Sequence, residues 1–306
     1  MIKQLLNKLE SIYYYRYFSK VKGGSENTLL KKIYKSTDII FIEKVFQLDF
    51  FREIIVPLPL DVDFKKKILV IAPHQDDELI GLGGTLLKYR NKGAKITLVF
   101  LTDGASIEDP IGSKTIRSIE AKNVAKVLNA EIIEIAIPNN TMEIHEIHFH
   151  KLQSIFENSR WDEIFTIWPL DGPPKHRICA YLLFKILQKN NISDILLTLY
   201  SVHTELIPNK YVDISNQIKD KGILLNYYKS QLNAQAYDHL SLARDAWSSR
   251  FLEVSNEKRY IEVFFKVTFK EYSKLMTIYN NVNSNQLFKG NQSCLTTFSY
   301  LKKIKL

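Results

Sequence analysis

Apolar and polar residues follow two distinct patterns along the chain from residue 66 onward. Short, nearly continuous apolar runs are typical of buried strands in a parallel sheet, and the amphipathic stretches of about 10 to 16 residues between them are typical of helices. Strands are predicted at 66–73, 95–104, 131–138, 162–169 and 194–203, and helices at 81–93, 115–129, 145–160 and 176–191. This order predicts an α/β fold of the Rossmann-like, three-layer kind with a mainly parallel sheet.

The pattern becomes weaker beyond residue 204. There we predict a short extended segment at 211–215, a helix at 219–233, a strand at 260–268 and a last helix at 270–281. No internal repeat and no long linker interrupts this part of the chain. We therefore divide the sequence into an N-terminal extension (1–65), one main domain (66–281) and a C-terminal tail (282–306).

The N-terminal extension begins with a potential amphipathic helix. Its apolar residues recur at helical spacing with lysines between them: Ile2, Leu5, Leu6, Leu9 and Ile12. Such a helix packs either on the main domain, the interpretation that we favour, or on a membrane surface. No apolar stretch reaches the ~18 residues of a membrane span, and the hydrophobic region of a signal peptide is missing. We expect a cytoplasmic protein, with contact to the inner membrane surface as the alternative.

Composition and charge narrow the range of partners. Hydrophobic residues make up 45% and charged residues 25% of the chain, as in ordinary soluble domains. The net charge of +9 favours anionic partners, but the basic residues are scattered and no stripe of basic and aromatic residues is present, so we expect no nucleic-acid binding. The two cysteines, Cys179 and Cys294, are too few for a disulfide framework and indicate a reducing compartment.

Candidate chemistry is concentrated directly after the first predicted strand, in "IAPHQDDELIGLGGTL" (71–86). His74, Asp76 and Asp77 fall at the carboxyl end of that strand, where a divalent cation would offset the repulsion between the carboxylates. One imidazole and one or two carboxylates are two-thirds of a His₂-carboxylate zinc site. His176 follows the fourth strand directly and would complete the site if strands one and four are neighbours.

Other interpretations of these residues are weaker. Acidic residues that follow a strand often lie in a solvent-exposed turn and bind no metal. Gly81, Gly83 and Gly84 come too late for a dinucleotide fingerprint, because acids occupy the turn where a pyrophosphate would lie. Adjacent acids cannot flank a sugar as a glycosidase pair does, at ~5 Å or more. The histidines of "HEIHFH" (145–150) are interpreted as surface residues.

The motifs resemble those of the LmbE-like/PIG-L family of zinc-dependent N-deacetylases. The similarity runs from about 66 to 266 and rests on segments that occur in the family's order: "APHQDDELIGLGGTL", "FLTDG", "RSIEA", "PPKHR", "VDIS", "YKSQL" and "YIEVFF". The N-terminal extension and the tail lie outside it.

The resemblance implies a role for each matching residue. His74, Asp77 and His176 would hold Zn²⁺, with Fe²⁺ as a second candidate, and Asp76 would be the general base. Glu78 and Glu120 are expected behind this first layer of residues. Arg117 matches a substrate-contacting position, although a surface ion pair between Arg117 and Glu120 explains it equally well.

Three residues depart from the family pattern. Gln75 replaces the usual proline of the first motif, and in the second motif Pro173 and Lys175 stand where a histidine and an aspartate are common. Stabilisation of the oxyanion would then fall to Lys175 or His203, both of which we count as candidate substrate-binding residues. A lysine beside the site would also suit an anionic substrate.

The sequence thus predicts a metal-dependent hydrolase that removes the N-acetyl group from an N-acetylated amino sugar. A glycolipid, nucleotide-sugar or surface-polysaccharide precursor, phosphorylated or lipid-linked, is the expected substrate. The alternatives are a non-catalytic metal- or glycan-binding protein of the same fold and a deacylase that acts on a different amide.

Overall fold

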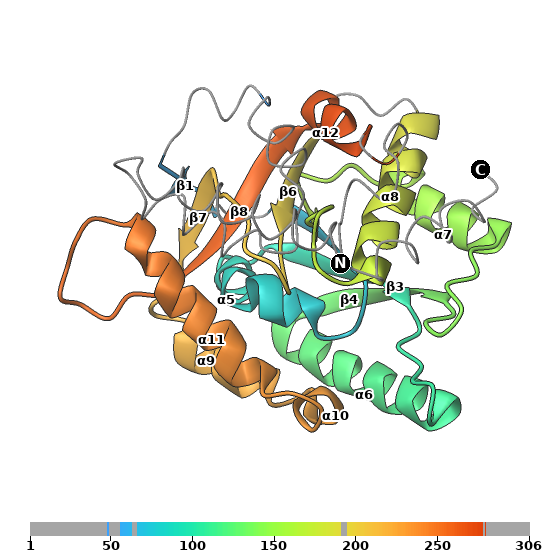
Figure 1. The fold of residues 1–306 in the computed structure, drawn as a ribbon, viewed down its shortest axis with the longest axis horizontal. Helices are drawn as coiled ribbons and strands as arrows, with labels where there is room; N and C mark the ends of the chain where they lie inside the picture. Colours follow the sequence, from blue (N-terminus) through green and yellow to red (C-terminus); the bar gives the residue numbers. More distant parts are fainter. Residues whose placement is uncertain (1–47, 49–55, 63–65, 191–194, 278, 280–306) are drawn as a thin grey trace, which may run out of the picture.

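The computed structural model describes residues 48, 56–62, 66–190, 195–277 and 279. The predicted N-terminal helix, nearly all of the extension and the C-terminal tail lie outside these residues, as does the end of the last predicted helix. Within the described part, three layers are visible, with a central sheet between two layers of helices (Figure 1).

The sheet has eight strands in the order β1-β7-β8-β6-β5-β2-β3-β4. Their bounds are β1 Leu58–Pro59, β2 Lys67–Ala72, β3 Lys95–Thr102, β4 Ala130–Ile137, β5 Glu163–Ile167, β6 Leu196–Tyr200, β7 Lys210–Asp213 and β8 Ile261–Thr268. Strands β2 to β6 are parallel, whereas β8 runs antiparallel to both β6 and β7. The mainly parallel sheet is confirmed, and β2 pairs with β5, so the first and fourth predicted strands are neighbours.

Helices cover both faces of the sheet (Figure 1). Their bounds are α5 Asp77–Asn91, α6 Pro110–Leu128, α7 Glu146–Glu157, α8 Pro174–Lys189, α9 Ile218–Leu225, α10 Lys229–Leu232, α11 Tyr237–Ser248 and α12 Phe269–Met276. One buried cluster joins β-strand residues to α7, α8 and α12, and a second joins the opposite face to α5, α6 and α9. This two-sided burial explains why the strands are continuous apolar runs rather than alternating ones.

The helix prediction needs four corrections. The helix predicted at 219–233 is two helices, α9 and α10, and α11 was not predicted at all. The buried residues of α11 are the polar Ser241, Asp245 and Ser248, so no apolar period marks it. Helix α5 begins four residues earlier than predicted, and α6 begins at Pro110, where the Asp109 side chain accepts a hydrogen bond from the Gly112 amide.

The parallel strands bring their carboxyl ends to one edge of the sheet. The loops after β2, β4, β5 and β6 carry His74, Asn139, Asp171 and His203, respectively. Among the described residues, no helix combines the length and apolar character needed to cross a membrane.

Candidate metal centre

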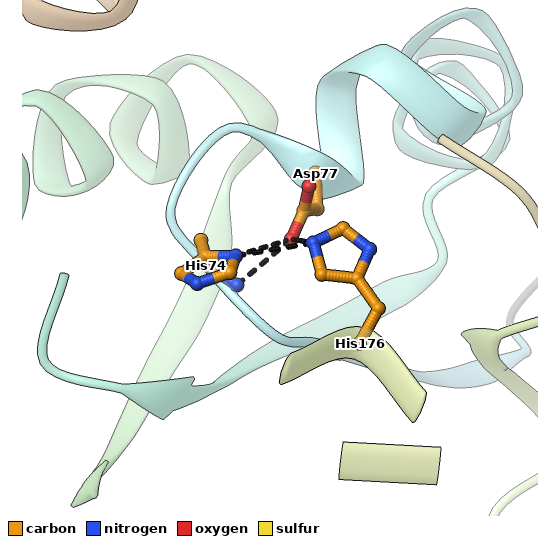
Figure 2. A group of neighbouring side chains, drawn as sticks. All are labelled: His74, Asp77 and His176. Atoms are coloured by element: carbon orange, nitrogen blue, oxygen red, sulfur yellow. Dashed lines mark hydrogen bonds and ion pairs between the residues drawn. The ribbon is translucent and has the colours of Figure 1, made fainter. Parts of the chain in front are cut away.

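His74, Asp77 and His176 converge at this edge of the sheet (Figure 2). Nδ1 of His74 lies 3.2 Å from Oδ2 of Asp77 and 3.2 Å from Nε2 of His176, and the latter two atoms are 3.4 Å apart. The three atoms therefore form a nearly equilateral triangle. His74 is half-buried, whereas Asp77 and His176 are buried.

Local structure explains how each of the three is presented. His74 lies in the turn between β2 and α5, and its amide donates to Oδ2 of Asp77 at 2.9 Å. Asp77 is the first residue of α5, a position where a carboxylate is favourable. His176 lies in the first turn of α8, which follows the extended Pro173 and begins at Pro174.

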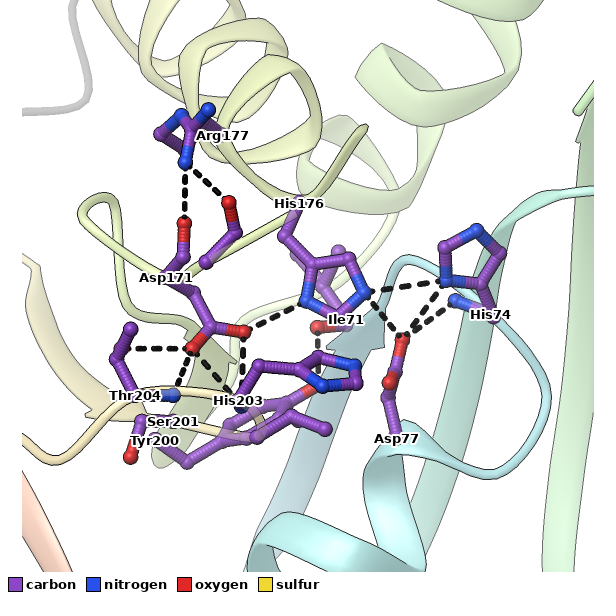
Figure 3. A network of polar contacts seen from close by, with 12 residues as sticks. Ile71, His74, Asp77, Asp171, His176, Arg177, Tyr200, Ser201, His203 and Thr204 are labelled. Carbon is purple, nitrogen blue, oxygen red and sulfur yellow. Dashed lines mark hydrogen bonds and ion pairs between the residues drawn. The ribbon is translucent and has the colours of Figure 1, made fainter. Parts of the chain in front are cut away.

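The second nitrogen of each imidazole contacts a hydrogen-bond acceptor, and Figure 3 shows this contact for His176. Nδ1 of His176 lies 2.7 Å from Oδ2 of the fully buried Asp171, and Nε2 of His74 lies 3.0 Å from Oδ1 of Asn139. Both oxygens accept hydrogen bonds, so each ring carries its proton on that side in the neutral form and turns its lone pair toward Asp77. Sequence reasoning missed Asp171 and Asn139, and their place after β5 and β4 is the signal that would have found them.

These residues fit a divalent metal ion. A metal with bonds of about 2.0–2.2 Å to tetrahedral ligands separates those ligands by about 3.3–3.6 Å, close to the observed triangle. Two neutral imidazoles and one carboxylate with fixed second-layer partners are the donor set of a catalytic zinc site. Among the residues that the structure describes, this is the group of His, Cys, Asp and Glu side chains close enough to share an ion.

Asp171 is the centre of a wider network. It accepts hydrogen bonds from the amides of His203 and Thr204 and from the Thr204 hydroxyl, in addition to the contact with His176. Arg177 donates to the Asp171 carbonyl at 2.8 Å. Burial alone would raise the pKa of the Asp171 carboxyl, but the hydrogen bond and charge of His176 outweigh it and lower that pKa. Asp171 is thus held as a carboxylate behind His176.

The ionisation of the three converging groups follows from the same contacts. Burial lowers the pKa of His74 despite the nearby Asp77 carboxylate. For Asp77, burial opposes ionisation, but the two histidines lower its pKa well below the usual range. Burial also opposes protonation of His176, yet Asp77 and Asp171 together raise its pKa.

Asp76 has an unusual backbone. Its φ of 133° and ψ of −30° lie outside the regions that non-glycine residues normally adopt, and such strain is often found at functional sites. Oε2 of Glu78 accepts a hydrogen bond from the Asp76 amide at 3.1 Å, and Oε1 of Glu78 accepts one from the Tyr228 hydroxyl at 2.6 Å. Glu78 therefore supports the strained turn that presents Asp76.

The two acids beside Asp77 are both buried and have raised pKa values. Burial and the Asp77 charge raise the pKa of Asp76, whereas Arg117 lowers it. Burial raises the pKa of Glu78 to about 7, although the hydrogen bonds that its carboxyl group accepts favour the charged form. A hydrogen bond from the Asp77 backbone also favours the charged form of the Asp76 carboxyl group.

Arg117 and Glu120 do not form the surface ion pair that the sequence allowed. The Arg117 guanidinium donates to Oε1 of Gln231 in α10, and its charge acts on His74 and Asp76. Glu120 instead accepts hydrogen bonds from the amide and the hydroxyl of Ser230. Both residues of α6 therefore attach α10 beside the site.

Three other candidate residues come from segments next to the triangle: Gln75 follows His74, Lys175 precedes His176, and His203 lies in the loop after β6. Partial burial and the neighbouring Arg117 charge lower the pKa of Lys175. The His203 ring lies between those of His176 and Tyr237, at centroid distances of 5.2 and 5.9 Å. Gln75 is buried, and its side-chain amide donates to the Thr102 carbonyl at 3.3 Å.

A hollow of about 780 Å³ lies beside the site between α6 and the ends of β3 and β4. Gln75 and Asn139 line its inner end, and both polar and apolar side chains of α6 line its wall: Ile111, Lys114, Ser118, Ile119 and Lys122. This volume is in the range of small-molecule pockets.

The "HEIHFH" segment has a structural role. His148 is buried, contrary to the surface interpretation, and its Nδ1 accepts a hydrogen bond from the His145 amide at the start of α7. His145 and His150 are exposed.

Part of the chain is similar to known proteins. Residues 69–187 match the family model described as "PIG-L: GlcNAc-PI de-N-acetylase". A diacetylchitobiose deacetylase of Thermococcus kodakarensis is 26% identical over 208 residues, which are 56% of this chain and 73% of that protein.

Two solved structures share the fold. The N,N'-diacetylchitobiose deacetylase of Pyrococcus horikoshii superimposes with a TM-score of 0.58 and 21% identity, covering 81% of this chain and 94% of that one. GalB, the 4-carboxy-2-hydroxymuconate hydratase of Pseudomonas putida KT2440, superimposes with a TM-score of 0.55 and 16% identity, covering 66% and 96%. One is a deacetylase and the other a hydratase, so these two likenesses establish the fold and not the reaction.

Proposed function

We propose that this chain, which carries a PIG-L family domain over residues 69–187, is a metal-dependent hydrolase that removes the acetyl group from an N-acetylated amino sugar. The observation that supports this most directly is the triangle of His74, Asp77 and His176, in which a hydrogen-bond acceptor holds the second nitrogen of each imidazole. The buried carboxyl group of Asp76 is next to Asp77 in the chain.

The three converging residues would hold the metal, and Zn²⁺ or Fe²⁺ both accept this donor set. Such an ion acts as a Lewis acid that polarises an amide carbonyl and makes water more acidic. Asp76 is the general base that takes a proton from the attacking water. The amide C–N bond then breaks, acetate is released, and the proton is passed to the nitrogen that stays on the sugar.

Lys175 and His203 are the candidates for stabilising the negative charge on the carbonyl oxygen. The His203 ring lies against that of His176, and Lys175 directly precedes His176 in the first turn of α8. Together they would take over the role of the histidine and aspartate that are common in the family where this chain has Pro173 and Lys175.

The relative that acts on diacetylchitobiose supports an amino-sugar substrate. The charge of Arg117 acts on the candidate base Asp76, and Lys175 lies close enough to Arg117 for the two charges to interact. These two cationic groups favour a substrate that carries an anionic group. We infer a phosphorylated sugar, such as a nucleotide-sugar or lipid-linked precursor. Its Michaelis constant should rise with salt concentration, and a salt-independent constant would argue for a neutral sugar.

The test combines metal analysis with release of acetate. The purified protein, Asp76→Asn and His176→Ala are analysed for bound metal and assayed with N-acetylglucosamine, its β-1,4-linked dimer and UDP-N-acetylglucosamine. Asn tolerates a positive φ better than most residues, so Asp76→Asn should preserve the turn.

We expect about one zinc or iron per chain in the unmodified protein and in Asp76→Asn, and loss of metal in His176→Ala. Acetate should be released only by the unmodified protein. Full turnover by Asp76→Asn would remove this residue from the mechanism. Metal and ligand binding without any turnover on these and longer N-acyl sugars would favour a binding protein of the same fold.

A further inference from the structure

Helix α5, which carries Asp77, is broken one turn after it begins. Leu82 has φ of −150° and ψ of 24°, which are not helical values, so the segment 77–81 is a separate turn from the rest of the helix. A break of this kind leaves amide donors on its carboxyl side and carbonyl acceptors on its amino side without partners inside the helix.

The free amides after the break are satisfied by a distant carboxylate. Oε1 and Oε2 of Glu262 accept hydrogen bonds from the amides of Gly84 and Thr85 at 2.8 and 2.7 Å. If Leu82 is the capping position, these are the second and third amides of the new helix, which a capping side chain normally satisfies. Leucine has no acceptor, and Glu262 of β8 provides it from 178 residues away.

The free carbonyl before the break is satisfied in the same way. The carbonyl oxygen of Ile80 accepts hydrogen bonds from Lys221 Nζ at 3.3 Å, from Ser241 Oγ at 3.0 Å and from the Arg244 guanidinium at 2.5 Å. These donors come from α9 and α11. Cationic groups are the favourable partners for the carboxyl end of a helical segment.

Lys221 joins the two sides of the break. Its ammonium group lies 2.8 Å from Oε1 of Glu262 and 2.6 Å from Oδ2 of Asp245, and all three side chains are fully buried. Buried charges are unfavourable for folding unless they are fully paired. An unbroken helix would satisfy the same backbone groups by itself, so burial of this ionic network is explained by the break that it stabilises.

We propose that Glu262 and Lys221 are positioning residues for the candidate metal centre. By capping both sides of the break they fix the direction of the turn 77–81, and with it the place of Asp77 relative to His176. This inference rests on the proposed function of the site, because its consequence is measured as metal affinity and turnover.

The test compares Glu262→Gln with a matched control, Glu163→Gln. Glu163 is also a buried glutamate on a strand of the same sheet and accepts hydrogen bonds from Lys266 Nζ at 2.8 Å, but it lies at the opposite end of the sheet from the candidate centre. Glutamine keeps the shape of the side chain and leaves Lys221 paired with Asp245, so both variants should fold.

Four quantities are measured on the full-length protein well below its melting temperature: the zinc dissociation constant, kcat, KM, and the rate of amide hydrogen exchange in 77–91. In Glu262→Gln we expect roughly tenfold weaker zinc binding, a kcat lowered by about the same factor, a nearly unchanged KM and faster exchange in this segment. Glu163→Gln should lose stability but keep the other values of the unmodified protein.

Equal zinc affinity, kcat and α5 exchange in the two variants would overturn the positioning role. An unmodified protein that neither binds zinc nor releases acetate would instead refute the proposed function. In that case the exchange rates alone decide whether Glu262 orders the turn.

Discussion

Nδ1 of His176 lies 2.7 Å from Oδ2 of Asp171, and this contact selects the nitrogen that faces His74 and Asp77. The carboxylate is fully buried and accepts three further hydrogen bonds from His203 and Thr204, so it cannot rotate freely. The direction of the His176 lone pair is therefore determined by the loop after β5 and not by α8 alone.

This contact predicts a strong effect of Asp171→Asn. The amide would direct an N–H group at Nδ1 of His176, which favours the tautomer whose proton points at the metal position. Metal affinity should fall about 10- to 100-fold, with a similar loss of turnover, as measured by zinc titration and an acetate assay. Asp162→Asn is the control, because Asp162 also accepts an amide hydrogen bond but lies at the opposite end of β2. Equal effects of the two substitutions would contradict the prediction.

The partner of His74 provides a second comparison between two adjacent residues. Asn139 holds Nε2 of His74 and donates to the Ala105 carbonyl, whereas Asn140 donates to the Ser106 carbonyl only. Asn139→Ala should weaken zinc binding by about tenfold, and Asn140→Ala should leave it unchanged. If both variants bind zinc like the unmodified protein, Asn139 does not orient the imidazole.

The first turn of α5 requires a glycine at position 81. A Cβ atom there would lie 2.3 Å from the ring of Tyr200, which is buried and anchored through its hydroxyl to the Ile71 carbonyl. Gly81→Ala should destabilise the protein by about 1–3 kcal/mol in urea unfolding.

Gly222→Ala is the matched substitution in a helix with space for a methyl group. Its nearest neighbour, Leu242, would lie at 3.4 Å, so alanine should stabilise α9 by about 0.5–1 kcal/mol. If Gly81→Ala raised the urea midpoint as Gly222→Ala is expected to do, the contact with Tyr200 would not prevent a methyl group at position 81.

The buried ionic network predicts a pH-dependent stability. Burial raises the pKa of Asp245 to about 6, with Lys221 and Arg244 lowering it and Glu262 raising it. Between about pH 4 and 6 the folded protein therefore holds a proton that the unfolded chain has released, so this group's contribution to stability falls as pH rises through that window.

Asp245→Asn removes this titrating group, so the difference in stability between the variant and the unmodified protein reports the contribution of Asp245 alone. The free energy of unfolding of the variant, relative to the unmodified protein, should rise by on the order of 2 kcal/mol from pH 4 to pH 7. Urea unfolding at several pH values measures this difference. A difference that is constant across the range would show that Asp245 stays ionised throughout.

The sequence was sufficient for strands β2 to β6 and for most of the helices that cover the sheet. It missed β1, which lies in the segment assigned to the N-terminal extension but pairs with β7. Continuous apolar runs report burial on both faces, and each of the five predicted parallel strands is found within a few residues of its expected place. The predicted strand order also placed His74 and His176 at one edge of the sheet, because right-handed connections constrain the strand order in such folds. The pairing of β2 with β5 agrees with this prediction. Helix α11 escaped detection because its buried residues are polar.

The sequence by itself determined the layered α/β architecture, since the apolar period is a local property of the chain. Residue spacing marked His74, the acids after it and His176 as candidate ligands, and the family resemblance separated Asp77 from Asp76. Only the tertiary structure decided how that centre is held: Asp171 and Asn139 behind the imidazoles, Gln231 at Arg117, and Glu262 and Lys221 at the break in α5. Most of these are single polar contacts between residues far apart in the sequence. Such contacts leave no periodic pattern in the sequence. Each hydrogen bond depends on how two distant side chains are oriented, and that orientation is set by the packing of the folded chain.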